Sequence, residues 1–256
     1  MIQAVIFDLD GTLVQTERLK ALSYARAALE LRPDAFDEEG VFAAFRDVVG
    51  LSRQEVATTL VERFDLKDAA QARMAEFGVA TPWQAYLQLR LRHYETLIAD
   101  PDVLRNSRWP HTVNLLHAAR QAGCRVGLAT MSYCPQVQHV LAVLELADAF
   151  DFIATRDDVE HGKPDPEIYL LVAKQLAIVP HACLVIEDSP TGVKAAQAAG
   201  MPVIAVSTPF TRDVLHAGGL LDKRWIVDDP HMLPAVLQAR MEHQTVPRNE
   251  PQRFTR

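Results

Sequence analysis

Residues 2–13, IQAVIFDLDGTL, join a nearly continuous apolar run to two aspartates. The apolar run predicts a central strand that is buried on both faces of a sheet. Asp8 and Asp10 follow where that strand should end, and residues two apart on a strand share a face, so their carboxylates should lie close together. Such carboxylates resist joint ionisation unless a cation neutralises them or one keeps a proton. The stretch predicts an acidic site or, more simply, a strand that ends in a polar turn.

Composition excludes several classes of protein. The chain has 256 residues, 49% apolar content and a net charge of −7, which fit a globular protein and offer no basic surface for nucleic acid. Its three cysteines are odd in number and lack CxxC spacing, as expected in a reducing compartment. The N-terminus shows no signal features, and no apolar run reaches the ~18 residues of a membrane span. We therefore expect a cytoplasmic protein without membrane or nucleic-acid partners.

A long helical insertion is expected after the first strand. Between residues 16 and 100 the apolar residues recur at helical spacing, and no strand pattern interrupts them. The segment Asp100–Arg108 is predicted to be the linker back to the sheet. These patterns predict a core of residues 1–15 and 101–240, a helical domain of residues 16–100, and a loosely ordered polar tail of residues 241–256.

From Pro110 onward, helical patterns alternate with short apolar strands. Such alternation predicts an α/β fold with a doubly wound, mostly parallel sheet. The strands after the first are expected at residues 125–130, 151–155, 183–186, 203–206 and 226–227.

Polar residues follow the first four predicted strands. In open α/β sheets, ligands bind beyond the carboxyl ends of the strands, so these side chains should meet at one edge. Taken singly, the hydroxyls and acids could be helix caps, and the lysine a solvated turn residue. Their joint occurrence favours a site made of Asp8, Asp10, Thr130, Ser132, Lys163, Glu187 and Asp188.

The chemistry of this set points to phosphoryl transfer. Several carboxylates without a Cys or His cluster favour a hard, oxygen-coordinated cation such as Mg²⁺. Hydroxyls and a lysine opposite the metal suit the oxygens of a phosphoryl group. One carboxylate can attack phosphorus while a second protonates the leaving oxygen.

Four segments resemble the motifs of the haloacid dehalogenase (HAD) superfamily. They are DLDGTL at residues 8–13, Thr130, GKPDP at residues 162–166, and IEDSPTGVKAAQAAG at residues 186–200. The helical block after the first motif resembles the β-phosphoglucomutase-like branch, whose HAD-like Rossmannoid core carries a helical cap. The resemblance implies phosphoryl transfer, because the halide- and phosphonate-cleaving members lack an acid at the position of Asp10.

The resemblance also implies roles for the residues at the strand ends. Asp8 would be the nucleophile and a Mg²⁺ ligand, and Asp10 would be the general acid/base and bind the metal through its backbone carbonyl. Lys163 would neutralise the nucleophile and the phosphate. The metal site would be completed by Glu187 and Asp188, and the phosphoryl oxygens would be held by Thr130, Met131 and Ser132.

In the helical block, Thr16 matches the hinge threonine of this branch, and Gly50-Leu51-Ser52-Arg53 resembles its substrate-specificity loop. Arg90 falls near the position where the mutases place a lysine for the distal phosphate. One departure weighs against a mutase, because Lys20 stands where the mutases carry a histidine. Cys134 also stands where they have an asparagine.

The sequence therefore predicts a Mg²⁺-dependent phosphatase that acts on a small phosphorylated metabolite, expected to be a sugar phosphate, through an aspartyl-phosphate. The alternatives are a β-phosphoglucomutase-like phosphomutase and a non-catalytic binding protein on the same scaffold. A monomer or weak dimer is expected.

Overall fold

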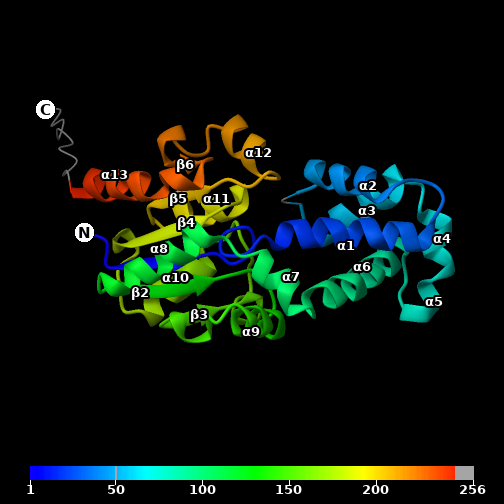
Figure 1. Cartoon of the computed structure of the whole chain (residues 1–256), viewed down its shortest axis with the longest axis horizontal. Coiled ribbons are helices and arrows are strands. Elements are labelled where there is room, and N and C mark those ends of the chain that lie inside the picture. Colours follow the sequence, from blue (N-terminus) through cyan, green and yellow to red (C-terminus); the bar gives the residue numbers. More distant parts are fainter. Residues whose placement is uncertain (50, 246–256) are drawn as a thin grey trace, which may run out of the picture.

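The computed structural model describes residues 1–49 and 51–245, and its centre is a parallel sheet (Figure 1). Within these residues the sheet has six strands in the order β3-β2-β1-β4-β5-β6, and every neighbouring pair is parallel. The predicted α/β, doubly wound sheet is confirmed. The strands are β1 (Ala4–Phe7), β2 (Arg125–Ala129), β3 (Phe152–Ala154), β4 (Cys183–Glu187), β5 (Val203–Val206) and β6 (Ile226–Val227).

The first strand, β1, lies in the interior of the sheet, and both of its faces are covered. Val5 and Phe7 belong to one hydrophobic cluster, whereas Ala4 and Ile6 belong to another on the opposite face. Helices α8, α9 and α13 supply residues to the first cluster, and α10, α11 and α12 to the second. Their bounds are α8 (Pro110–Gln121), α9 (Cys134–Val143), α10 (Glu167–Gln175), α11 (Pro190–Ala198), α12 (Arg212–Ala217) and α13 (Leu233–Thr245).

Helix α13 extends into the segment that the sequence assigns to the polar tail. Residues 241–245 continue α13 instead of leaving it, because no helix breaker stands before Pro247 and the intervening residues tolerate a helix. The rest of the predicted tail, residues 246–256, lies outside the described residues.

A helical block lies beyond one edge of the sheet and has its own core. Tyr24, Phe45, Leu60, Tyr86 and Leu89 are buried in a third hydrophobic cluster. The long helices α1 and α6 pack together along its length (Figure 1). Its helices are α1 (Thr16–Leu31), α2 (Glu38–Ala44), α3 (Arg53–Arg63), α4 (Lys67–Ala72), α5 (Met74–Phe77) and α6 (Pro82–Ile98).

Two short chain segments connect the block to the sheet. They run side by side, since Val14 pairs with Arg108 and the Gln15 amide donates to the Ser107 carbonyl at 2.7 Å. The predicted linker, Asp100–Arg108, is not irregular throughout, because it contains helix α7 (Pro101–Asn106). Pro101 occupies the first helical position, and the Asp100 side chain caps the helix by accepting from the amide of Asp102. The domain boundaries remain predictions.

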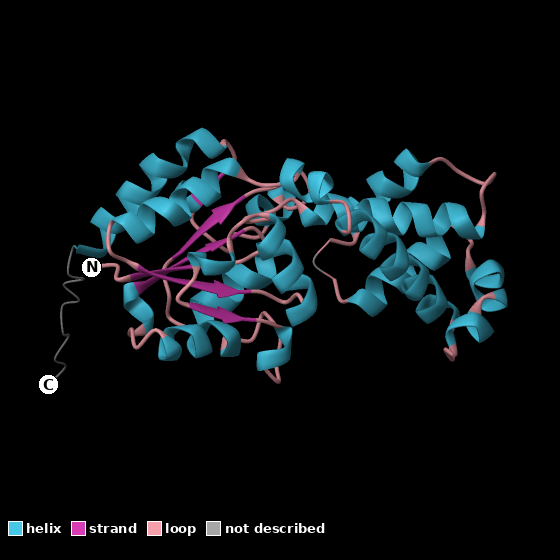
Figure 2. Cartoon of the chain, turned by 60° about the horizontal axis from the view of Figure 1, so that its bottom comes forward, coloured by secondary structure: helices cyan, strands magenta, loops and turns pink. Residues whose placement is uncertain are grey.

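The carboxyl ends of the strands face the helical block, as the arrowheads in Figure 2 show. Residues that follow the strands are therefore placed between the sheet and the block. No helix in the described part of the chain combines the length and apolarity needed to cross a bilayer.

Candidate active site

The turn after β1 places the first two acids. Gly11 has a backbone φ of +87°, a conformation that L side chains rarely adopt. A Cβ atom at Gly11 would lie 2.1 Å from Oδ2 of Asp188, so the position also has no room for a side chain. The glycine therefore allows the β1 turn to approach the end of β4, and this brings Asp8 close to Asp188.

Lys163 links the ends of three strands. Its Nζ donates to Oδ1 of Asp8 at 2.7 Å, to Oε1 of Glu187 at 2.7 Å, and to the carbonyl of Ala129 at 3.0 Å. Its side chain is only 4% exposed. Burial alone would lower the pKa of Lys163, but the two carboxylates raise it well above its usual value. Lys163 is thus a buried, fully hydrogen-bonded cation beside Asp8.

Glu187 is fixed on both carboxylate oxygens. Oε1 accepts from Lys163 and from the Tyr169 hydroxyl at 3.0 Å, while Oε2 accepts from the amides of Asp188 and Ser189, both at 2.9 Å. Burial would raise the pKa of Glu187, but Lys163 and these hydrogen bonds lower it. Glu187 therefore holds Lys163 and Tyr169 in place, and its carboxylate could also contribute an oxygen to a metal ion.

Asp188 carries the strongest sign of a missing positive charge. Within the described residues, its buried Oδ2 has no hydrogen-bond partner. Burial, together with the charges of Glu17, Glu187 and Asp8, raises the pKa of Asp188 well above its usual value. Carboxylate oxygens of Asp8, Glu187 and Asp188 lie within 4.8 Å of one another, so these residues could hold a metal ion. An orphaned oxygen within an all-oxygen donor set fits a hard divalent cation.

Asp10 has a different environment, although it lies two residues from Asp8. Its carboxylate accepts from the hydroxyls of Thr16 and Ser132, and Nζ of Lys20 lies 3.2 Å from Oδ1. Burial would raise the pKa of Asp10, but Lys20 and the two hydroxyls lower it. Burial raises the pKa of Asp8 to about 8 in spite of Lys163. The two acids are therefore electrostatically distinct.

Of the three phosphate-binding residues predicted after β2, two line the cleft and one is buried. Met131 and Ser132 line the cleft. Thr130 is fully buried behind them, and its Oγ1 accepts from the Ser132 amide at 3.1 Å. The contact between Thr130 and a phosphoryl group stays a prediction.

The helical block forms the opposite wall of a cleft of about 660 Å³. Lys20, Ser52, Arg53 and Arg90 line it together with Asp8, as the sequence predicts for one site. Gly50 of the predicted specificity loop lies outside the described residues. A cleft of this volume suits a small metabolite.

Arg90 is a buried cation held by aromatic rings. Its guanidinium carbon lies 5.0 Å from the ring centre of Tyr24 and 4.6 Å from that of Tyr94. The residue is 4% exposed, and its Nε has no hydrogen-bond partner among the described residues. Burial lowers the pKa of Arg90. Asp10 acts on this charge from a distance, but Arg90 forms no ion pair within the described residues, so it can bind an anion from the cleft.

Glu17 and Tyr133 are among the cleft residues that the sequence prediction missed. Glu17 lines the cleft, and its Oε2 accepts from the Thr208 hydroxyl at 2.8 Å. Tyr133 follows Ser132 and lies under the guanidinium of Arg53. Glu17 lies between Thr16 and Lys20 in the first turn of α1. Because both of these residues were predicted to belong to the site, Glu17 could have been predicted to lie near it.

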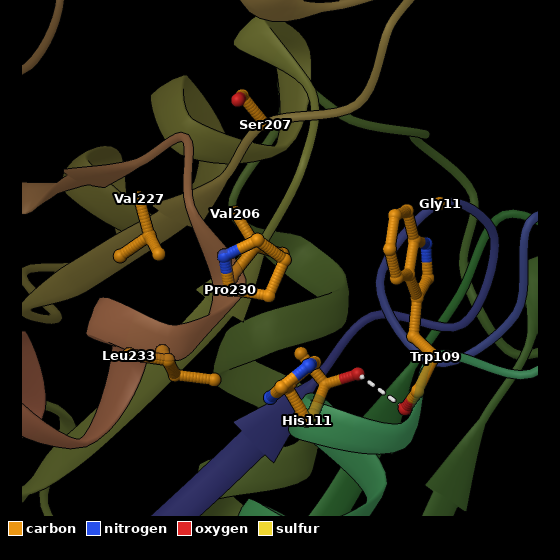
Figure 3. Close-up of a pocket in the computed structure, with 9 residues that line it drawn as sticks. Gly11, Trp109, His111, Val206, Ser207, Val227, Pro230 and Leu233 are labelled. Atoms are coloured by element: carbon orange, nitrogen blue, oxygen red, sulfur yellow. Dashed lines mark hydrogen bonds between the residues drawn. The ribbon is translucent and has the colours of Figure 1, made fainter.

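A second, smaller cavity lies beside the turn after β1 and is shown in Figure 3. Its volume is about 20 Å³, room for one water molecule, and its wall includes Val206, Val227 and Leu233. The Trp109 ring lies beside the turn at Gly11, and both residues line this cavity (Figure 3). The cavity is too small and too apolar for a phosphorylated substrate.

Comparison with known proteins places this site in a family. A family model described as haloacid dehalogenase-like hydrolase matches residues 2–200. The chain belongs to this family. The predicted resemblance is confirmed, and the chain is therefore an enzyme of the HAD phosphatase or phosphomutase type.

Individual relatives include both types. A phosphorylated carbohydrates phosphatase from Thermotoga maritima is 31% identical over 199 residues, which cover 78% of this chain and 82% of that protein. A phosphoglycolate phosphatase from Salmonella typhimurium is 31% identical over 210 residues, with coverage of 80% and 81%. The structure of β-phosphoglucomutase from Clostridium difficile superposes with a TM-score of 0.68 at 25% identity, covering 95% of this chain and 99% of that one.

Proposed function

We propose that this HAD enzyme is a Mg²⁺-dependent phosphatase of small sugar phosphates. The observation that carries the proposal is that the carboxylates of Asp8 and Asp10 have different partners. Lys163 binds Oδ1 of Asp8, whereas Lys20 and two hydroxyls hold Asp10 separately. This difference supports Asp8 as the nucleophile and Asp10 as the proton carrier.

In the proposed first step, a carboxylate oxygen of Asp8 bonds to phosphorus as the ester P–O bond breaks. Asp10 gives the leaving oxygen the proton that it took up from water in the preceding turnover. In the second step, water attacks the aspartyl-phosphate and passes a proton to Asp10, and the Asp8–phosphorus bond breaks. Lys20 favours the ionised form of Asp10, which is the form that accepts this proton. Lys163 keeps Asp8 oriented and offsets negative charge in both steps.

Asp8 and Asp188 would hold Mg²⁺, with the backbone carbonyl of Asp10 and the carboxylate of Glu187 nearby. The ion would supply positive charge against the phosphoryl oxygens. The sugar phosphate class is inferred from the size of the cleft and from the relative that dephosphorylates carbohydrates.

A screen for phosphate release tests this proposal. The purified protein is incubated with a panel of phosphorylated sugars and short acids, with Mg²⁺ titrated and with EDTA as the metal-free arm. We expect phosphate release from at least one sugar phosphate and a loss of at least about 100-fold in EDTA, because the clustered carboxylates need the cation. A flat response across the panel at every Mg²⁺ concentration would contradict the proposal.

A phosphomutase is the second candidate, and two arginines favour it. Arg53 and Arg90 line the cleft, and neither forms an ion pair with a carboxylate within the described residues. Two such cations could grip the second phosphate that a mutase must hold. Lys20, in place of the mutase histidine, opposes this candidate.

The two candidates differ in what attacks the aspartyl-phosphate. The protein is incubated with β-glucose 1-phosphate and a bisphosphate primer, and the products are separated. A phosphatase is expected to release inorganic phosphate in step with substrate loss. Formation of glucose 6-phosphate without inorganic phosphate would instead establish the mutase.

A further inference from the structure

The side chains of Arg53 and Tyr133 meet in the cleft. Arg53 is the first residue of α3 in the helical block, and Tyr133 is the N-cap residue of α9 at the sheet. The guanidinium carbon of Arg53 lies 5.1 Å from the ring centre of Tyr133. Both residues line the cleft. The contact therefore joins the two walls between which a substrate must lie.

Helix stability does not explain Arg53. A cation at the first position of a helix is opposed by the partial positive charge of the helix N-terminus. The start of α3 is already stabilised by a capping box, in which the Ser52 amide donates to Glu55 at 2.9 Å and the Glu55 amide donates to the Ser52 hydroxyl at 3.3 Å. Because this box fixes the backbone, it presents the arginine to the cleft.

The mode of contact leaves the guanidinium able to bind an anion. When an aromatic ring covers its face, its N–H groups still point outward in its plane. A carboxylate partner would occupy these donors, and in the described residues Arg53 forms no ion pair with one. Tyr133 is 42% exposed, so its ring is placed at the surface instead of in the core.

We propose that Tyr133 is a positioning residue that sets substrate specificity: its ring holds Arg53 across the cleft so that the enzyme prefers substrates with a second anionic group. The proposal rests on the phosphatase or mutase function of the cleft. The proposal applies to Arg53 and not to Arg90. The guanidinium of Arg90 is held by Tyr24 and Tyr94, and both rings belong to the same helical block as Arg90. Of these two arginines, Arg53 is the one whose ring comes from the sheet side.

The test compares glucose 6-phosphate with glucose 1,6-bisphosphate, which differ in one phosphate. Binding is measured by titration calorimetry with Mg²⁺ in an Asp8→Asn background, where turnover does not interfere. We expect tighter binding of the bisphosphate, and a reduction of that preference by about two- to fivefold in Tyr133→Leu, the order of an exposed cation–π contact. Tyr133→Phe, which keeps the ring, should retain the preference.

Arg53→Gln should lower the preference as well, and Tyr133→Leu should add nothing in the Arg53→Gln background, because Tyr133 acts through Arg53. Arg105→Gln, at an exposed position of α7, is the matched control. Equal binding of the two sugars, an unchanged preference in Tyr133→Leu, or additive effects in the double variant would overturn the proposal.

Turnover with the Asp8 side chain intact separates this proposal from the proposed function. The effect of Tyr133→Leu is expected in KM for the bisphosphate more than in kcat. Absence of phosphate release and of isomerised product from either sugar would count against the proposed function alone, since the binding preference is measured without turnover.

Discussion

Asp8→Asn is expected to reduce phosphate release by at least about 10³-fold, because an amide cannot attack phosphorus in place of a carboxylate. The substitution preserves the shape of the side chain, and Lys163 can still donate to the remaining carbonyl oxygen. The rate is measured with p-nitrophenyl phosphate and with the best sugar phosphate, at saturating Mg²⁺. Asp34→Asn, an exposed position outside the site, serves as the control for the same chemical change.

Stability distinguishes loss of the nucleophile from loss of the fold. Burial raises the pKa of Asp8 from 3.8 to about 8, so ionised Asp8 destabilises the folded protein without metal. A group whose pKa is raised by folding contributes stability at low pH and loses that contribution as the pH rises through the folded pKa. In EDTA, Asp8→Asn should therefore be at least as stable as the wild type, with a gain that grows between about pH 4 and pH 8. Retained activity in a folded variant would remove Asp8 as nucleophile.

The arrangement of the sheet was predictable because burial on both faces leaves a strong pattern. β1 and β4 are short runs of buried residues, and their polar neighbours mark the strand ends. Short helices were harder to predict. Helix α7 depends on a cap from Asp100 and on Pro101, and six residues carry too little periodicity to show a helix.

The candidate site was predictable where it depends on the sheet. Asp8, Lys163 and Asp188 meet because parallel strands bring their carboxyl ends to one edge. Contacts between the sheet and the helical block were not predictable in the same way. Tyr133 meets Arg53, and Glu17 meets Thr208, only because of how the block is oriented, and no local pattern encodes that orientation.

The two aromatic contacts of Arg90 differ in whether the sequence could predict them. Tyr94 lies four residues further along the same helix, so its contact with Arg90 follows from helical spacing. Tyr24 comes from α1 and reaches Arg90 only through the packing of α1 on α6. The sequence thus indicated a cation in the block but not that two aromatic rings would hold it.

Lys163→Met is expected to impair both catalysis and folding, because one buried cation serves two buried carboxylates. Its loss leaves Asp8 and Glu187 without their shared positive charge, and removal of one partner from a buried pair costs about 3–5 kcal/mol. We also expect phosphate release to fall by at least about 100-fold, because the charge that offsets the nucleophile and the phosphate is gone. Lys194→Met, at an exposed position of α11, controls for the substitution itself.

The pH dependence of this loss identifies its cause. Without Lys163, the raised pKa of Asp8 should rise further and the lowered pKa of Glu187 should rise as well, so the variant is least impaired where both are protonated and more impaired as the pH rises. Urea unfolding at pH 5 and pH 8 is expected to show the larger deficit at pH 8. Lys163→Arg keeps the charge but not the reach of the three hydrogen bonds, so it should recover part of the stability and little of the activity. An equal deficit at both pH values would mean that lost packing, and not uncompensated charge, accounts for the effect.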